Sequence, residues 1–297
     1  MGDPRRLTFG LVPPASFLGV EPRVNAFLRW VGERAGVQLV RRQARSYDEL
    51  VKLLRIGDLD VAWLPPIPFA RLDGEGVVRA LVTAERGGVD QYVSVLLSRA
   101  DSPISVLSDI KGKRVGWVDP LSATGYVVPR MRLAARFPAG PAGGHARVFS
   151  TETFFGSHAA VVRAILEGAV DVGATYGGFD DDGSLVRGPF LEVGVDASRL
   201  RVVEAFGAIP PDVIAVHSHV AHEIGENLAV AFEQTSKDPL ALEHVHVLFG
   251  AMFFIKKPLL GYDLLRSEVE HGVDSGVIPA AAAFLSTRPP PGSSSND

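Results

Sequence analysis

The sequence predicts an α/β protein of two lobes, each a mostly parallel sheet flanked by helices, with crossing hinge strands that join the lobes. Three observations lead to this fold class. Apolar strand-like runs alternate with amphipathic segments, which is typical of parallel βαβ units. The alternation begins a second time after about residue 100, and one helix-and-strand unit occurs twice. A chain of 297 residues with 46% hydrophobic content is long enough to bury two medium-sized cores.

The individual elements follow from runs of β-branched and apolar residues that separate the amphipathic segments. In the first series the expected strands are 7–12, 37–42, 59–64 and 77–82, and the expected helices are 20–35 and 46–56. The apolar run 91–99 leads into the second series. Its expected strands are 114–118, 146–150, 170–175 and 201–206, with helices that start at Ser122 and Ser157. Residues after about His219 are expected to be mostly helical, and the Pro- and Ser-rich tail 288–297 to be disordered.

The duplicated unit reads "SYDELVKLLRIGDLDVA" at 46–62 and "SHAAVVRAILEGAVDVG" at 157–173. In a gapless alignment the identical positions include the pairs Ser46 and Ser157, Val51 and Val162, Gly57 and Gly168, and Asp60 and Asp171. Each serine stands where it would cap a helix, and Glu49 adds the acid of a capping box in the first copy. Two copies of one unit indicate two lobes. The alternative is a chance similarity between two amphipathic helices.

The capping serines place Tyr47 and His158 at the first turns of their helices. In open parallel sheets the helix N-termini lie at the carboxyl edge of the strands, where ligands bind. We therefore expect Tyr47 and His158 on opposite walls of one cleft. In "DPLSATG" a third helix begins, and its free N–H groups, the hydroxyls of Ser122 and Thr124 and the small Gly125 suit a tetrahedral oxyanion. An ordinary capped helix has the same local pattern.

Charge and composition argue against several other classes of function. The net charge is −4 and the basic residues are scattered, so no basic face for nucleic acid is expected. Without cysteine the chain has no disulfide, thiolate zinc site, iron–sulfur cluster or cysteine nucleophile. The N-terminus as printed lacks the apolar core of a secretory signal, which predicts a cytoplasmic protein. The prediction becomes periplasmic or membrane-associated if a leader was trimmed or missed.

The histidine-rich segment "HSHVAH", with His217, His219 and His222, is the best indication of a metal or hydrolase site. No acidic residue stands at a suitable spacing from it, and the segment runs from a strand into a helix. The chain also lacks the G-x-S-x-G, Walker and G-x-G-x-x-G patterns. We therefore predict a binding protein that is not an enzyme and uses no metal or cofactor.

Three stretches resemble one family of binding proteins. "DPLSATGYVVPRM", followed by "FFGSHAAVVRAILEGAVDVGA" and then "AIPPD", looks like the phosphonate, phosphite and phosphate substrate-binding proteins of ABC transporters. The resemblance runs from about Leu7 to Gly250 and implies a type II periplasmic-binding fold that closes on its ligand. Ala123 departs from the pattern, because the family usually has a hydroxyl residue there. The backbone N–H of Ala123 remains available to an anion.

The resemblance also implies the site and the partners. The ligand-binding residues carried over from the family motifs are Ser122, Ala123, Thr124, Gly125, Ser157, His158, Tyr47, Tyr92 and Asp212. Tyr92 could instead pack in the core, and Asp212 could be a turn or capping residue. Aminophosphonate binders use a further acid after the strand 170–175, and the nearest acids here, 180–182, come too late in the sequence to recognise an amino group.

The predicted lobes are 1–96 with 211–287, and 97–210, and their hinges lie near 94–99 and 208–213. The predicted function is the capture of a small oxyanion by closure of a monomer, for uptake through an ABC transporter permease. The alternatives are a cytoplasmic ligand sensor that signals to a partner protein and an enzyme of cofactor biosynthesis on the same two-lobe fold. The start of the gene would separate transporter from sensor, and product formation would reveal an enzyme.

Overall fold

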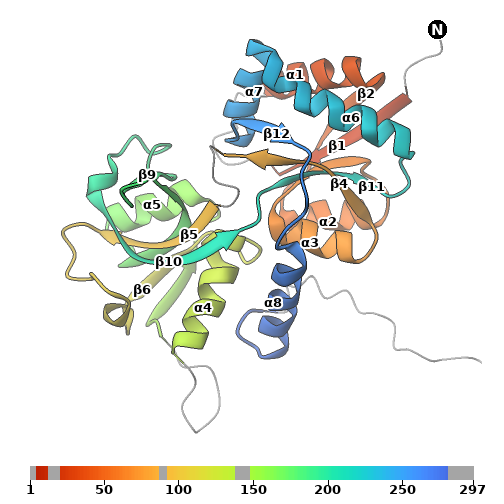
Figure 1. The fold of residues 1–297 in the computed structure, drawn as a ribbon. Coiled ribbons are helices and arrows are strands. Elements are labelled where there is room, and N and C mark those ends of the chain that lie inside the picture. Colours follow the sequence, from red (N-terminus) through yellow and green to blue (C-terminus); the bar gives the residue numbers. More distant parts are fainter. Residues whose placement is uncertain (1–4, 13–20, 87–91, 138–147, 280–297) are drawn as a thin grey trace, which may run out of the picture.

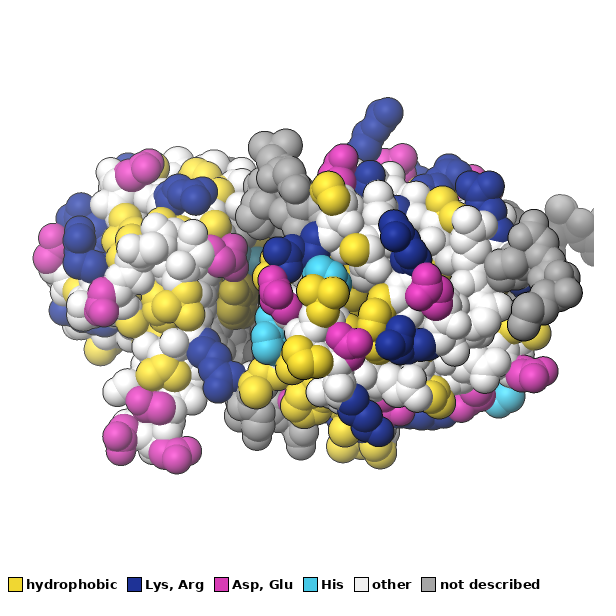
Figure 2. Space-filling model, turned by 90° about the horizontal axis from the view of Figure 1, so that it is seen from above, with side chains coloured by type: hydrophobic (Ala, Val, Ile, Leu, Met, Phe, Trp, Pro, Cys, Tyr) yellow, Lys and Arg dark blue, Asp and Glu magenta, His cyan; other side chains and the backbone are white. Residues whose placement is uncertain are grey.

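The computed structural model describes residues 5–12, 21–86, 92–137 and 148–279, and it consists of two α/β bodies that lie side by side (Figure 1). The first sheet has the strand order β12-β4-β11-β3-β1-β2, and the second has the order β10-β5-β8-β6-β7 with β9 paired to β8. The expected α/β class with two sheets is confirmed. Basic and acidic side chains are interspersed on the face shown in Figure 2, and a furrow separates the two bodies there.

The first body contains six strands and most of the helices. Its strands are β1 (Arg5–Leu11), β2 (Val37–Gln43), β3 (Val61–Leu64), β4 (Val78–Glu85), β11 (Val213–His217) and β12 (Phe253–Ile255). Its helices are α1 (Glu21–Ala35), α2 (Tyr47–Arg55), α3 (Pro66–Gly74), α6 (His222–Gln234), the short η5 (Thr235–Lys237), α7 (Pro239–Phe249) and α8 (Tyr262–Asp274).

The second body has a smaller set of helices around its sheet. Its strands are β5 (Tyr92–Arg99), β6 (Arg114–Trp117), β7 (Thr151–Phe154), β8 (Val172–Phe179), β9 (Leu185–Arg187) and β10 (Leu200–Ile209). Its helices are η2 (Leu107–Ile110), the π-helix η3 (Ala123–Val127) that continues into α4 (Val128–Arg136), α5 (His158–Leu166) and η4 (Ala197–Arg199).

Each sheet combines two parallel strand pairs with antiparallel ones, so neither is mostly parallel as expected. β1 pairs in parallel with β2 and β3, and β6 pairs in parallel with β7 and β8. The other described pairings are antiparallel. The reason is the route of the chain, which leaves the first sheet along β4, enters the second along β5, and returns from β10 to β11. The expected hinge segment 94–99 lies within β5, between β10 and β8.

The two copies of the repeated unit have the same local geometry. The Ser46 Oγ accepts a hydrogen bond from the Glu49 N–H at 3.2 Å, and the Ser157 Oγ accepts one from the Ala160 N–H at the same distance. The glycines that end the two helices, at 57 and 168, have φ angles of 75° and 74°. Glu49 accepts from the N–H of Arg45, one residue before the position that a capping box uses.

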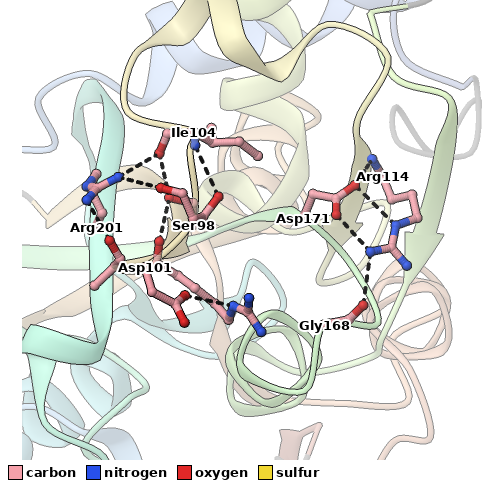
Figure 3. A network of polar contacts seen from close by, with 10 residues as sticks. Ser98, Asp101, Ile104, Arg114, Gly168, Asp171 and Arg201 are labelled. Atoms are coloured by element: carbon pink, nitrogen blue, oxygen red, sulfur yellow. Dashed lines mark hydrogen bonds and ion pairs between the residues drawn. The ribbon is translucent and has the colours of Figure 1, made fainter.

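The aspartates of the repeat also make equivalent long-range contacts. The Asp60 Oδ2 accepts from the Thr8 N–H of β1 at 2.7 Å, and the Asp171 Oδ2 accepts from the Arg114 N–H of β6 at 2.8 Å (Figure 3). The carboxylate just before β3 therefore binds β1, and the one just before β8 binds β6. In both cases the two strands are parallel neighbours. Gly168 adds a further link, because its carbonyl accepts from the Arg114 guanidinium at 3.0 Å. A chance similarity of two amphipathic helices would not reproduce this tertiary bond.

The structure differs from the sequence-based expectation at three places. The strand expected at 146–150 begins later, at Thr151, and residues 146–147 lie outside the described part. Val148 and Phe149 are apolar because they are buried in the core beside the sheet, whereas the side chains of β7 are exposed at its edge. Helix α3 follows a proline-rich segment that did not suggest a helix, yet Pro66 occupies the first turn, where the missing N–H costs nothing. β12 is a three-residue strand within a region expected to be mostly helical.

Helix α8 joins the two bodies. It packs against α3 of the first body, and its Glu268 accepts a hydrogen bond from Arg132 of α4 at 2.6 Å (Figure 1). At its start, the buried Tyr262 hydroxyl donates to the Pro211 carbonyl at 2.6 Å, beside the return from β10 to β11. Among the described helices, none combines the length and the apolar character that a membrane span requires.

Candidate functional site

Two helices of the second body, η3 and α5, begin at the same edge of its sheet. The π-helix η3 follows β6, and α5 follows β7, its parallel neighbour, so both helices start at the carboxyl edge of the sheet. Just before these starts, the Gly156 N–H donates to the Val118 carbonyl at 2.8 Å. The positive ends of the two helices therefore lie at the same edge of the sheet, and the segments that lead into them are in contact.

The helix start after Ser122 is well packed. The Ser122 Oγ accepts from the Gly125 N–H at 3.0 Å, while the preceding N–H groups, of Ala123 and Thr124, have no intrahelical carbonyl to bind. The side chains of Ser122 and Thr124 are 7% and 3% exposed. The hydroxyl of Ser94 on β5, itself buried, donates to the Thr124 carbonyl at 2.7 Å and fixes the first turn. These N–H groups and hydroxyls form a compact set of donors.

Gly125 is required by packing against the strand. A side chain added at Gly125 would collide with the side chain of Val118 and with the Ser122 Oγ. The sequence interpretation assigned this glycine to the close approach of a ligand. The structure supplies a nearer reason, which is the fit of the helix start onto the end of β6.

His158 is held in a neutral state. Its Nδ1 lies 2.8 Å from the Oγ1 of Thr175, a fully buried residue of β8, and its ring contacts Tyr176 edge-on at 5.0 Å between centroids. Burial and the positive charge of Arg86 lower the pKa of His158 from 6.5 to about 4. When the Thr175 hydroxyl donates to Nδ1, the proton of the neutral ring is on Nε2, which can then donate to an anion. The neighbouring N–H groups of this helix start add to the donors after Ser122.

Tyr47, at the start of α2 in the first body, is half-buried against the core. Burial, together with the negative charges of Asp212 and Asp119, raises the pKa of Tyr47 far above its ordinary value of 10. The hydroxyl therefore keeps its proton at neutral pH and is a donor. Asp119 belongs to the turn before Ser122 on the second body, so the charges around Tyr47 come from both bodies. The side chain of Tyr92, the remaining predicted tyrosine, lies outside the described residues.

Asp212 is paired with a residue that sequence reasoning missed. Its Oδ2 accepts from the Nη2 of Arg86 at 2.5 Å, and the same Nη2 lies 3.1 Å from the Phe249 carbonyl at the end of α7. Arg86 also affects the pKa of Tyr47 and of His158, one on each body. The backbone carbonyl of Arg86 also accepts a hydrogen bond from Arg187 of β9, so Arg86 lies where the first body contacts the second.

The supporting residues Ser94 and Thr175 were also absent from the predicted set. Each is a polar side chain at a fully buried position of a strand, Ser94 in "QYVSVLLS" and Thr175 at the end of "VDVGAT". A buried hydroxyl needs a partner, so a polar residue in an otherwise apolar strand is the signal that could have revealed them. Arg86 carried no comparable signal, because its partner is 126 residues away.

The histidine segment is a separate cluster at the far end of β11. His219 Nε2 lies 2.8 Å from the Asp60 Oδ1, and the rings of His217 and His219 stack with centroids 4.0 Å apart. Over the ranges that the structure describes, no group of three or more His, Cys, Asp or Glu residues could hold a metal ion.

The arrangement of two sheets joined by crossing strands defines a class of protein. It is the type II periplasmic-binding fold, in which a solute binds between two α/β bodies. The chain of PhnD1 from Prochlorococcus marinus (MIT 9301), solved in complex with methylphosphonate, has this fold with a TM-score of 0.69 at 18% identity, covering 92% of this chain and 100% of that one.

A sequence model described as "ABC transporter, phosphonate, periplasmic substrate-binding protein" matches residues 9–251. The chain belongs to this family. It is 25% identical to the phosphate-import protein PhnD of Mycolicibacterium smegmatis over 239 residues, which are 78% of this chain and 73% of the relative. It is 30% identical to the phosphonates-binding periplasmic protein of Escherichia coli over 142 residues, 44% of this chain and 40% of that protein.

Family membership confirms a solute-binding role of the kind that ABC importers use. The family consists of substrate-binding transport proteins rather than enzymes and is periplasmic by its description. These relatives do not favour either alternative, the ligand sensor or the enzyme on the same fold.

Proposed function

We propose that this protein captures a small tetrahedral oxyanion, of the phosphonate, phosphite or phosphate type, in the cleft between its lobes. The observation that carries the proposal is the contact between two helix starts, where the Gly156 N–H binds the Val118 carbonyl. Each first turn offers N–H groups without intrahelical partners, and the two helix dipoles add at one point. Such a point attracts an anion and binds its oxygens through the backbone.

The second lobe supplies most of the donors in this proposal. Ser122, Thr124 and His158 donate from their side chains, and Ala123, Gly125 and Ser157 shape the two turns. Ala123 gives an N–H where the family pattern has an additional hydroxyl. The bonds from Ser94 to the Thr124 carbonyl and from Thr175 to His158 support this arrangement, because they fix both donors before a ligand arrives.

The first lobe closes over the ligand from the other side. We assign β1 to β4, β11 and β12 to this lobe and β5 to β10 to the second, with the hinges in the segments that cross between them; the boundary expected at residue 96 moves to before β5, because β5 pairs with β10 and β8. Tyr47 and Asp212 then line the first-lobe wall, and Tyr92 remains part of the proposed ligand-binding set. A ligand that touches both lobes stabilises the closed state by its difference in affinity, and a transporter permease recognises that state. We further propose a monomer without enzymatic activity that is periplasmic or membrane-associated.

Titration calorimetry at neutral pH with methylphosphonate, phosphite, phosphate and sulfate tests the ligand class. We expect at least one of the three phosphorus oxyanions to bind, and to stabilise the protein by about 2.7 kcal/mol at 100 times its dissociation constant. Thr124→Ala removes one hydroxyl donor to a charged group, which costs roughly 1.5–3 kcal/mol, or about tenfold to 150-fold in affinity. His158→Ala is expected to cost a comparable amount.

Thr151→Ala is the matched control, because Thr151 is an exposed threonine at the opposite end of the parallel strands. It should bind like the parent. Unchanged affinity in both Thr124→Ala and His158→Ala would show that the anion binds elsewhere, and binding of none of the oxyanions would refute the proposed function itself.

A further inference from the structure

Helix α8 is fixed at its start to the first body and to the segment that returns from β10 to β11. The buried Tyr262 hydroxyl donates to the Pro211 carbonyl at 2.6 Å, and the Tyr262 ring packs edge-on against Phe69 of α3, with centroids 4.9 Å apart. One turn further on, the Arg266 guanidinium donates to the Ala70 carbonyl of α3 at 3.3 Å. The first half of α8 therefore moves with the first body.

The second half of α8 reaches the second body. The Glu268 carboxylate accepts from the Arg132 guanidinium of α4 at 2.6 Å, and a methyl group added at Gly272 would lie 3.1 Å from the Sδ of Met131, also on α4. The glycine thus lets the two helices approach closely. The ion pair is open to water, since the Arg132 side chain is 52% exposed, and such pairs are weak. The contact between α4 and α8 can therefore separate and form again at little cost.

Helices α4 and α5 lie on opposite faces of the second sheet. Leu133 of α4 shares a core cluster with Leu96 of β5, whereas Val161 of α5 shares another with Leu97, the next residue of the same strand. Successive side chains of a strand point to opposite faces of the sheet. The first cluster also contains Val269 of α8, so α8 lies on the same side of the second sheet as α4.

The two bodies also meet on the other side of the crossing strands. There Arg187 of β9 donates through its Nη1 to the backbone carbonyl of Arg86, which follows β4. Figure 1 shows α5 and β9 at the upper end of the second body, β5 and β10 in the middle, and α4 with α8 at the lower end. Figure 2, which is seen from above, shows the furrow from the side opposite α4 and α8. The crossing strands therefore separate the α4–α8 contact from the furrow.

A hinge between the two contacts makes them oppose each other. A rotation about the crossing strands that opens the bodies on the furrow side brings α4 and α8 together, and closure on a ligand moves them apart. Glu268 and Gly272 lie about 9 and 15 Å along α8 from Tyr262, the residue tied to the hinge segment. At this distance a rotation changes the separation of α4 and α8 appreciably, because the displacement grows with the length of the lever.

We propose that α8 is a strap behind the hinge whose contact with α4 favours the open cleft, so that this contact regulates how tightly the anion is bound. The inference rests on the proposed function, because closure over the anion is the step that the strap opposes. When only a small fraction of the empty molecules is closed, the apparent affinity of the ligand is reduced by that fraction. A change at the strap then alters the affinity without altering a ligand-binding residue.

Met131→Trp tests the strap, because a larger and rigid ring between α4 and α8 obstructs the open form more than the closed form. The chain has no cysteine, so Lys52→Cys in α2 and Arg163→Cys in α5 can carry spin labels at exposed, equivalent positions of the repeated unit. Pulsed electron paramagnetic resonance then measures the distance between the two bodies.

In the protein without ligand, Met131→Trp should shift this distance toward shorter values than in the parent. In titration calorimetry it should bind methylphosphonate about fivefold more tightly than the parent. This is the change in apparent affinity if the closed fraction of the empty protein rises from roughly 10% to roughly 50%.

Two further variants keep the test interpretable. Met131→Ala combined with Glu268→Gln removes the same contact without adding bulk, so it reports on the strap even if the tryptophan variant does not fold. It should shift the distance in the same direction and tighten the binding of methylphosphonate about twofold. Leu264→Trp adds a ring at an exposed position of α8 and should leave both the distance and the affinity unchanged.

The outcomes distinguish the strap from the proposed function. Ligand-free distances in both Met131 variants that equal or exceed the parent's overturn the inference, whereas binding of methylphosphonate by the parent leaves the oxyanion site standing. Shorter distances without any binding of methylphosphonate support the strap and count against the proposed ligand. An equal shift in Leu264→Trp also overturns the inference, because added bulk on α8 would then act without the contact to α4.

Discussion

The buried environment of His158 predicts a pH-dependent loss of stability that a single substitution should remove. Burial and the charge of Arg86 lower the pKa of this ring from its ordinary value of 6.5 to about 4. Between these two values the unfolded chain binds a proton that the folded chain does not bind. The free energy of unfolding therefore decreases as the pH falls from 7 toward 4. The stability that depends on a neutral His158 is fully present only above pH 6.5, the pKa of the ring in the unfolded chain.

The size of the effect follows from the two pKa values. Each unit of difference between the two pKa values corresponds to about 1.4 kcal/mol. Proton linkage then gives a decrease of about 2 kcal/mol in the free energy of unfolding between pH 7 and pH 5. The ring is half-buried, so access of water reduces the expected value to roughly 1–2 kcal/mol. Replacement by asparagine removes the titration and places an amide near the Nδ1 position, where it can keep the bond to Thr175.

Denaturant unfolding of the parent and of His158→Asn at pH 7, 6 and 5 measures the difference between the two profiles. Other groups titrate in both proteins and cancel in this difference. His222→Asn is the matched control, because His222 is an exposed histidine at the first position of α6. The reasoning is refuted if the parent and His158→Asn lose the same free energy between pH 7 and pH 5. A saturating phosphonate should reduce the loss in the parent, since a bound anion favours the protonated ring.

Three further predictions concern the elements that build the site. Gly125→Ala should lower the free energy of unfolding by about 1–3 kcal/mol because its methyl group meets the side chain of Val118, which denaturant titration will detect. Ser46→Ala and Ser157→Ala should each cost about 1 kcal/mol in the same assay, and clearly unequal losses would contradict the equivalence of the two repeated caps. Asp60→Asn weakens two hydrogen bonds from β1 to a charged acceptor and should cost roughly 1–3 kcal/mol at pH 7, whereas an unchanged unfolding midpoint would show that the tie to β1 does not stabilise the fold.

Local patterns in the sequence were enough to place most of the elements and both helix caps. The serines at 46 and 157 cap their helices as the repeat predicted, because capping depends on a bond between residues only three apart. The apolar periodicity of strands and helices is equally local and indicated two α/β units. It failed at Val148 and Phe149, which belong to the core but not to a strand, and at α3, where prolines obscured a helix.

The sequence by itself also determined the character of the predicted anion site, since the donors after Ser122 and the histidine at 158 follow directly from helix starts. Only the tertiary structure decided which groups surround them. Arg86 and Asp212 meet because β4 and β11 are neighbours in one sheet, and no periodicity in the chain records which strands will pair across 126 residues. The neutral state of His158 likewise depends on burial and on a distant cation, and both of these exist only after the two bodies have come together.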